Sequence, residues 1–169
     1  MLKVDLRQLA RKRRLVIDYE VRPDDPLWQR TGTTLVDPLA VRLDVQLAGQ
    51  DVIVRGELQT RVGLACRRCL VPVTAEVDEE VAWVFRPGLT RAEAEEAEVF
   101  PLPERGDELD LVDAIREQVV LSVPQYAMCS ETCRGLCGRC GANLNQAQCN
   151  CEVAEPDPRW SALRKLRTE

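Results

Sequence analysis

Eight cysteines restrict how this chain can fold more than any other feature, because six of them lie within the 23 residues from 129 to 151. A Cys-x-x-Cys turn directs two sulfur atoms at one point, about 2.3 Å from each sulfur, where a metal ion can bind. Four thiolates close one tetrahedral site, so eight can close two. The candidate metal ligands are Cys66, Cys69, Cys129, Cys133, Cys137, Cys140, Cys149 and Cys151.

The spacing of the cysteines suggests how they divide between two sites. The last four follow the pattern C-x2-C-x8-C-x-C from Cys137 to Cys151 and can close a site locally, since short loops cost little entropy to close. Cys129 and Cys133 then remain to meet Cys66 and Cys69, which lie far away in the sequence. Such a site would join the C-terminal region to the rest of the chain. We expect one or two structural zinc ions.

Disulfides and iron–sulfur clusters are the alternatives to zinc. The first 20 residues contain no apolar segment of signal-peptide length, and no later stretch approaches the roughly 18 uninterrupted apolar residues of a membrane span. These features predict a cytoplasmic protein, in which thiols stay reduced. Zinc is therefore favoured over disulfides.

Alternating apolar residues predict strands in the first half of the chain. The Cys66–Cys69 loop lies at the corner between the last two strands, and Gly56 predicts a β-bulge. Trp83 and Phe85 follow the apolar alternation, which favours a place in the core over a base-stacking role. The predicted strands are residues 15–21, 39–47, 52–64 and 71–85.

The pattern changes in the second half. Residues 86–106 combine prolines, glycines and acids, which favours a mobile loop over a short helix. From Asp107 the sequence predicts a helix that Asp110 caps and Pro124 ends. The residues on its apolar face are Leu111, Ile115 and Val119. Asp157–Pro158 predicts a short final helix; its apolar residues are Trp160, Leu163 and Leu166.

These elements predict an α+β protein dominated by an antiparallel sheet or partial barrel, with one main helix and a cysteine-rich, zinc-binding C-terminal appendage. At 169 residues the chain fits one domain, or one domain plus a small appendage. We expect a β-rich body with its packed helix in residues 1–128, and a zinc-binding tail with a short helix in residues 129–169.

Missing residue types argue against an enzyme. The chain has no histidine, which excludes histidine-based catalytic triads and HExxH proteases. None of its three serines lies in a G-x-S-x-G sequence, and neither a P-loop nor G-x-G-x-x-G occurs. A zinc ion held by four thiolates has no open position for water, so the expected zinc is structural.

Charge is distributed unevenly along the chain. Residues 1–14 contain six Lys/Arg and one acid, whereas residues 76–117 contain fourteen acids and four Arg. A zinc ion with four thiolates carries about −2, so arginines beside the cysteines can either balance this charge or contact phosphate. The candidate nucleic-acid contacts are Arg11, Lys12, Arg13, Arg14, Arg67, Arg68, Arg134 and Arg139.

The order of these segments, from about residue 35 to residue 169, resembles that of the bacterial YceD family. The most specific part is CRGLCGRCGANLN, from Cys133 to Asn145; it is followed by C-N-C and by D-P-R-W-x-x-L-x-x-L. The family is described as large ribosomal RNA subunit accumulation proteins. The resemblance implies a role in the synthesis, processing or stability of 23S ribosomal RNA and implies no enzymatic reaction.

Two modes of action are compatible with this resemblance. In the first, the basic residues contact ribosomal RNA on a zinc-stabilised scaffold. In the second, the protein is an escort or adaptor whose acidic residues 76–117 bind a basic large-subunit ribosomal protein or assembly factor. Neither mode involves a membrane or a small-molecule substrate.

Overall fold

A large open sheet forms the body of the protein. The computed structural model describes residues 2–102, 106–151 and 159. The strands of this sheet are β2 (Arg14–Val21), β3 (Thr34–Leu35), β4 (Leu39–Ala48), β5 (Asp51–Ala65), β6 (Pro72–Arg86) and β7 (Phe100–Pro101). Their order is β2-β4-β5-β6-β7, with β3 also paired to β5, and every pair is antiparallel except β6-β7.

Three helices and a second, two-stranded sheet complete the described fold. Strands β1 (Lys3–Asp5) and β8 (Glu108–Asp110) pair with each other in antiparallel orientation. The helices are α1 (Leu6–Lys12), α2 (Arg91–Glu96) and α3 (Val112–Ser122), and a 3-10 turn, η1, spans Pro26–Trp28. The predicted α+β class is confirmed. No helix in the described part of the chain is long and apolar enough to cross a membrane.

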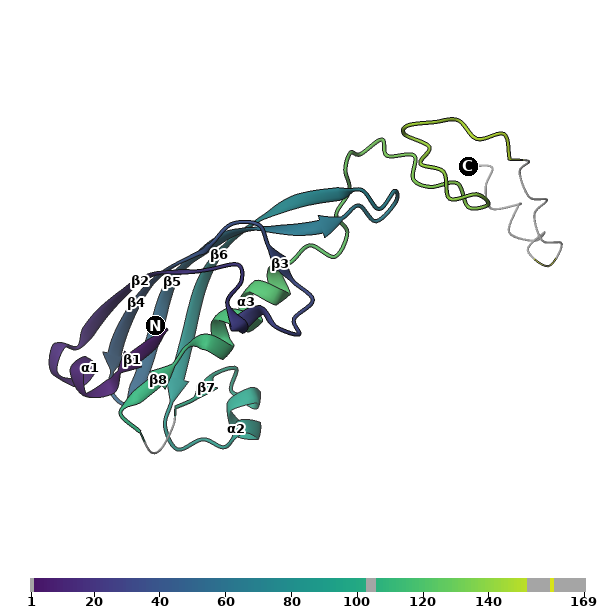
Figure 1. Cartoon of the computed structure of the whole chain (residues 1–169). Helices are drawn as coiled ribbons and strands as arrows, with labels where there is room; N and C mark the ends of the chain where they lie inside the picture. Colours follow the sequence, from purple (N-terminus) through teal and green to yellow (C-terminus); the bar gives the residue numbers. More distant parts are fainter. Residues whose placement is uncertain (1, 103–105, 152–158, 160–169) are drawn as a thin grey trace.

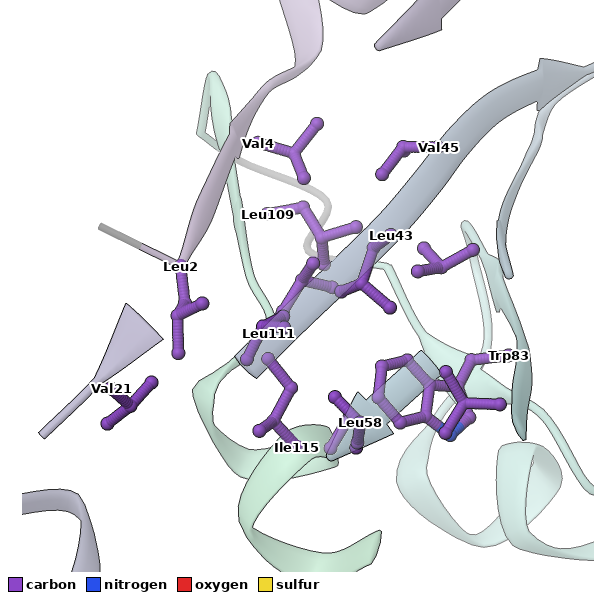
Figure 2. Packing of buried hydrophobic residues seen from close by; sticks show 14 of the residues in the cluster. Leu2, Val4, Val21, Leu43, Val45, Leu58, Trp83, Leu109, Leu111 and Ile115 are labelled. Carbon is purple, nitrogen blue, oxygen red and sulfur yellow. The ribbon is translucent and has the colours of Figure 1, made fainter. Parts of the chain in front are cut away.

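The core lies between one face of the large sheet and a layer formed by α3, α1, η1 and the β1–β8 sheet (Figure 1). Burial alternates along β4, β5 and β6, and nearly all of the buried positions are apolar, as the sequence predicts. Figure 2 shows Leu111 and Ile115 within the same cluster of core side chains as Leu43, Leu58 and Trp83, and Leu111, Ile115 and Val119 are fully buried. Trp83 and Phe85 are also buried, which confirms that they belong to the core.

Strands β5 and β6 form a hairpin that extends past the other strands toward the cysteine-rich region (Figure 1). Its pairing runs from Val52 opposite Phe85 to Ala65 opposite Pro72. The loop that closes the hairpin contains Cys66 and Cys69, so the predicted position of this loop at a corner between strands is confirmed. A long hairpin thus carries two cysteines away from the body.

The predicted β-bulge at Gly56 is wrong. Leu43, Gly56 and Val81 lie opposite one another in an uninterrupted register. A Cβ atom at position 56 would lie 1.9 Å from the carbonyl oxygen of Arg42. Glycine is present here because the β4 backbone leaves no space for a side chain.

The prediction of a mobile loop over residues 86–106 is also wrong for its described part. Thr90 and Glu93 form a reciprocal capping box at the start of α2, and β7 then pairs with β6. The next helix starts later than predicted, because residues 108–110 form β8 and the helix itself begins at Val112. The N-cap position is Leu111 rather than the predicted Asp110, although the Asp110 carboxylate accepts a hydrogen bond from the Val112 N–H. The predicted helix after Asp157 lies outside the described residues.

Candidate metal centres

The first group of cysteines joins two distant parts of the chain. Cys66 and Cys69, in the β5–β6 loop, meet Cys129 and Cys133, which follow α3, and the four Sγ atoms lie within 4.8 Å of one another. The Sγ atoms of Cys66 and Cys133 are 3.8 Å apart, and those of Cys69 and Cys129 are 3.5 Å apart. A tetrahedral zinc ion places its sulfur ligands about 3.8 Å apart, whereas a disulfide requires about 2.05 Å. The group therefore fits a metal centre.

The second group closes locally, as its spacing predicts. The Sγ atoms of Cys137, Cys140, Cys149 and Cys151 lie within 4.8 Å of one another. All eight cysteines are free thiols. The structure thus brings the candidate ligands together in the two sets of four that the sequence suggests. Each set can bind a metal ion.

The two Cys-x-x-Cys turns have the same backbone geometry. In the first, the Leu70 N–H donates to the Cys66 carbonyl, and the Cys66 N–H donates to the Val71 carbonyl. In the second, the N–H of Gly141 donates to the Cys137 carbonyl, and the Cys137 N–H donates to the Ala142 carbonyl. The residue after the second cysteine has a φ of 60° at Leu70 and 73° at Gly141. A positive φ suits glycine and is unfavourable for leucine.

Backbone hydrogen bonds lower the pKa of one thiol in each set. Hydrogen bonds from the backbone of Cys129 and Cys69 lower the pKa of Cys66 to about 6. Hydrogen bonds from the backbone of Cys140 and Arg139 lower that of Cys137 equally, to about 6. Each set thus contains a thiol that ionises readily, as metal binding requires.

A second thiol in each set has the opposite behaviour. Side-chain hydrogen bonds with Cys133 and Cys69 raise the pKa of Cys129 to about 12. A side-chain hydrogen bond with Cys140 is the main cause that raises the pKa of Cys151 to about 12. Four thiolates within one small volume repel each other, so one keeps its proton. A bound dication removes this repulsion and allows all four to ionise.

Asn145 supports the first centre from outside the set of ligands. Its side-chain Nδ2 donates to the Cys133 Sγ at 3.4 Å, and its Oδ1 accepts from the Arg134 N–H at 2.8 Å. Burial acts to raise the pKa of Cys133, but hydrogen bonds from the Asn145 side chain and the Gly135 backbone outweigh it and lower that pKa. Sequence reasoning did not assign this role to Asn145, although the residue ends the specific CRGLCGRCGANLN segment.

Backbone hydrogen bonds attach the cysteine-rich segment to the hairpin loop. The Arg67 N–H donates to the Ala127 carbonyl at 2.9 Å, and the Leu136 N–H donates to the Arg68 carbonyl at 3.0 Å. The Arg68 guanidinium also donates to the Cys133 carbonyl at 2.9 Å. We call residues 66–71 together with residues 126–151 the tip.

The candidate nucleic-acid contacts fall into two separate places. Arg67, Arg68, Arg134 and Arg139 are exposed on the tip. The run from Arg11 to Arg14 lies at the end of α1 and the start of β2, at the opposite end of the molecule (Figure 1). The structure therefore does not bring the two groups together.

Part of the basic N-terminal charge is already paired within the protein. Arg14 forms an ion pair with Asp44. Lys3 and Arg7 pair with Glu108 and Asp107 of the acidic segment. These contacts reduce the charge that the N-terminal region offers to an external partner.

Arg67 and Tyr126 form a pair that sequence reasoning missed. The Arg67 guanidinium lies over the Tyr126 ring, 4.0 Å from its centre, and 66% of Tyr126 is exposed to solvent. Tyr126 has no neighbouring aromatic residue in the sequence, and only the folded tip places it beside the CRRC loop. The pair presents an aromatic ring and a cation on one surface.

Comparisons with known proteins relate the chain to one family. The family described as "Large ribosomal RNA subunit accumulation protein YceD" matches residues 54–167, a range that contains all eight cysteines. This match begins later than residue 35, where the resemblance seen in the sequence begins. No solved structure matches the chain significantly.

Individual relatives come from plants and bacteria. A chloroplastic protein of Arabidopsis thaliana, named "Large ribosomal RNA subunit accumulation protein YCED homolog 1", is 26% identical over 78% of this chain and 49% of its own length. An uncharacterized protein of Mycobacterium leprae is 28% identical over 83% of this chain and 67% of its own. The chain thus spans about half the length of the plant relative. Because the family match covers more than half of the chain, this protein belongs to the YceD family of large ribosomal RNA subunit accumulation proteins.

Proposed function

We propose that this protein promotes the accumulation of 23S ribosomal RNA without catalysing a reaction, by contacting the RNA with a tip that two structural zinc ions keep folded. Family membership supports the connection to large-subunit ribosomal RNA. The two sets of cysteines support the zinc, since their sulfur spacing suits a tetrahedral ion. We place this role in the cytoplasm, where reduced thiols persist.

The observation that carries the RNA contact is the Arg67–Tyr126 pair. RNA-binding proteins stack unpaired bases on aromatic rings and arginine planes. Tyr126 lies three residues before Cys129, and Arg67 lies between two ligands of the same centre, so a bound ion would fix both side chains. A rigid stacking surface loses little entropy when RNA binds.

Two exposed apolar residues lie close to this pair in the sequence. Leu70, which follows Cys69, is 63% exposed, and Met128, which precedes Cys129, is 45% exposed. The Leu70 backbone has the positive φ that glycine adopts in the matching turn, so an exposed leucine is kept at a conformational cost. Exposed apolar groups of this kind favour a binding surface.

The charge of the tip favours unpaired RNA over duplex RNA. Two zinc ions with eight thiolates carry about −4, and Arg67, Arg68, Arg134 and Arg139 balance this charge. Glu131 adds one more negative charge within the tip, so the tip has no excess positive charge with which to follow a duplex backbone. The affinity for RNA therefore comes from stacking of bases on Tyr126 and from contacts with individual phosphates.

Replacing Tyr126 by alanine is expected to weaken binding of fluorescein-labelled, single-stranded segments of 23S ribosomal RNA about tenfold, because one stacked base contributes about 1–3 kcal/mol. Fluorescence anisotropy of the zinc-loaded protein measures this change. Tyr126→Phe keeps the ring and should retain binding. Tyr19→Ala is the control, since Tyr19 is another partly exposed tyrosine, on β2.

Equal affinity for the wild type and the Tyr126→Ala variant would remove the stacking surface from the proposal. The N-terminal run is tested in the same assay. If replacing all four basic residues from Arg11 to Arg14 leaves the affinity and its salt dependence unchanged, that run makes no RNA contact.

A further inference from the structure

A groove with an apolar floor lies at the side of the body, between α2, β7 and the β8–α3 segment. Its volume is about 610 Å³, within the range that protein pockets use for ligands. Ala94, Leu109 and Ala114 contribute buried apolar surface to its wall, and Phe85 stacks on Phe100 with ring centres 5.1 Å apart. The groove lies on the body and is separate from both cysteine sets.

Carboxylates surround this apolar floor. The acidic residues that line the groove are Glu95, Glu98, Asp110, Asp113 and Glu117, and no lysine or arginine is among the described residues that line it. Asp110 accepts a hydrogen bond from the Val112 N–H at the start of α3, and Asp113 pairs with Arg116. Within the described part of the chain, neither Glu98 nor Glu117 forms an ion pair, so their charges are available to a partner.

We propose that this groove binds a lysine- and arginine-rich segment of a partner protein, which inserts an apolar side chain between α2 and α3. The carboxylates at the rim attract the basic residues, and the phenylalanine pair accepts the apolar one. A polyanion such as RNA is disfavoured, because five carboxylates would repel its phosphates. The inference adds a protein-binding surface to the RNA contact proposed for the tip and does not depend on it.

The test uses the full zinc-loaded chain, labelled with nitrogen-15, and a synthetic peptide in which leucine and phenylalanine lie among lysines and arginines. Saturable movement of the amide signals of Ala94, Leu109 and Ala114 is expected on titration. A second peptide has serine in place of the apolar residues, and a third has glutamate in place of the basic ones. Both should bind at least tenfold more weakly, because each lacks one of the two required contacts.

A matched pair of variants separates the groove from the general charge of the protein. Glu98→Lys combined with Glu117→Lys should weaken binding of the first peptide at least tenfold. Glu57→Lys combined with Glu80→Lys makes the same change in charge at two exposed residues that face each other on β5 and β6. This control should bind within about twofold of the wild type. Tyr126→Ala should also leave peptide binding unchanged.

Several results would overturn the proposal. Unmoved groove amides, equal weakening by both pairs of variants, or equal binding of the serine peptide would each show that the groove does not select a basic segment with an apolar anchor. If the same amides move with protein concentration alone, the occupant is a second copy of this chain. If they move when the chain is ended after Glu155, without peptide, the occupant is the chain's own C-terminal segment.

Discussion

Replacing Cys66 and Cys69 by serine is expected to remove one of the two proposed zinc ions and to leave the other in place. These cysteines share a set with Cys129 and Cys133, whereas the second set closes within residues 137–151. Binding of a structural zinc ion contributes on the order of 10 kcal/mol to the folding of the residues that hold it. The attachment of residues 126–136 to the hairpin loop should therefore be lost, while the sheet stays folded.

Native mass spectrometry under reducing conditions counts the zinc ions, and limited proteolysis locates the unfolded segment. The reciprocal variant, Cys137→Ser with Cys140→Ser, should lose the second ion and keep the first. Loss of both ions from the Cys66/Cys69 variant would refute the division of the ligands into these two sets, as would retention of both.

Replacing Gly56 by alanine should lower the free energy of unfolding by about 3 kcal/mol or more, the upper part of the range for overpacked cores. The added Cβ would lie 1.9 Å from the Arg42 carbonyl oxygen and 2.9 Å from the Leu43 Cα. Because both atoms belong to the β4 backbone, the strands must separate to make space. Pairing between β4 and β5 would then weaken in the middle of the sheet.

Chemical denaturation of the zinc-loaded protein measures this loss. Gly63→Ala is the matched control on the same strand, since its Cβ would have ordinary contacts of 3.5 Å with Val36 and 3.7 Å with Thr34. The control should change stability by less than about 1 kcal/mol. An equally small effect at Gly56 would show that β4 does not approach this position as closely as described.

The strands were largely predictable because burial on one face imposes a period of two. The alternation predicts both ends of each of the four longest strands to within one residue of the observed ends. Gly56 misled the prediction because a strand glycine marks either a bulge or a close backbone approach, and only the register separates the two.

The errors after residue 86 have a common physical origin. The T-x-x-E sequence from Thr90 to Glu93 is a capping signal that the prediction of a loop did not use, since it rested on the prolines, glycines and acidic residues alone. Strand β8 has three residues and exists because β1, about a hundred residues earlier, pairs with it. Such long-range pairing leaves no periodic pattern in a short segment.

The cysteine sets were predictable from spacing alone, whereas their surroundings were not. Arg68 was expected to balance charge or contact phosphate, but it also donates to the Cys133 carbonyl. The stacking of Arg67 on Tyr126 depends on the attachment of residues 126–136 to the hairpin loop. Local sequence predicts which cysteines come together, but it does not predict which distant side chain a folded loop will meet.

Binding of 23S ribosomal RNA segments before and after removal of zinc tests the central claim most directly. The zinc-loaded protein should bind single-stranded segments with a salt-dependent affinity, and chelator treatment under reducing conditions should abolish binding, because the tip loses its fold while the sheet persists. Addition of zinc should restore binding. Unchanged RNA affinity in the protein freed of zinc would contradict the account, since it would show that the metal-held tip does not make the contact.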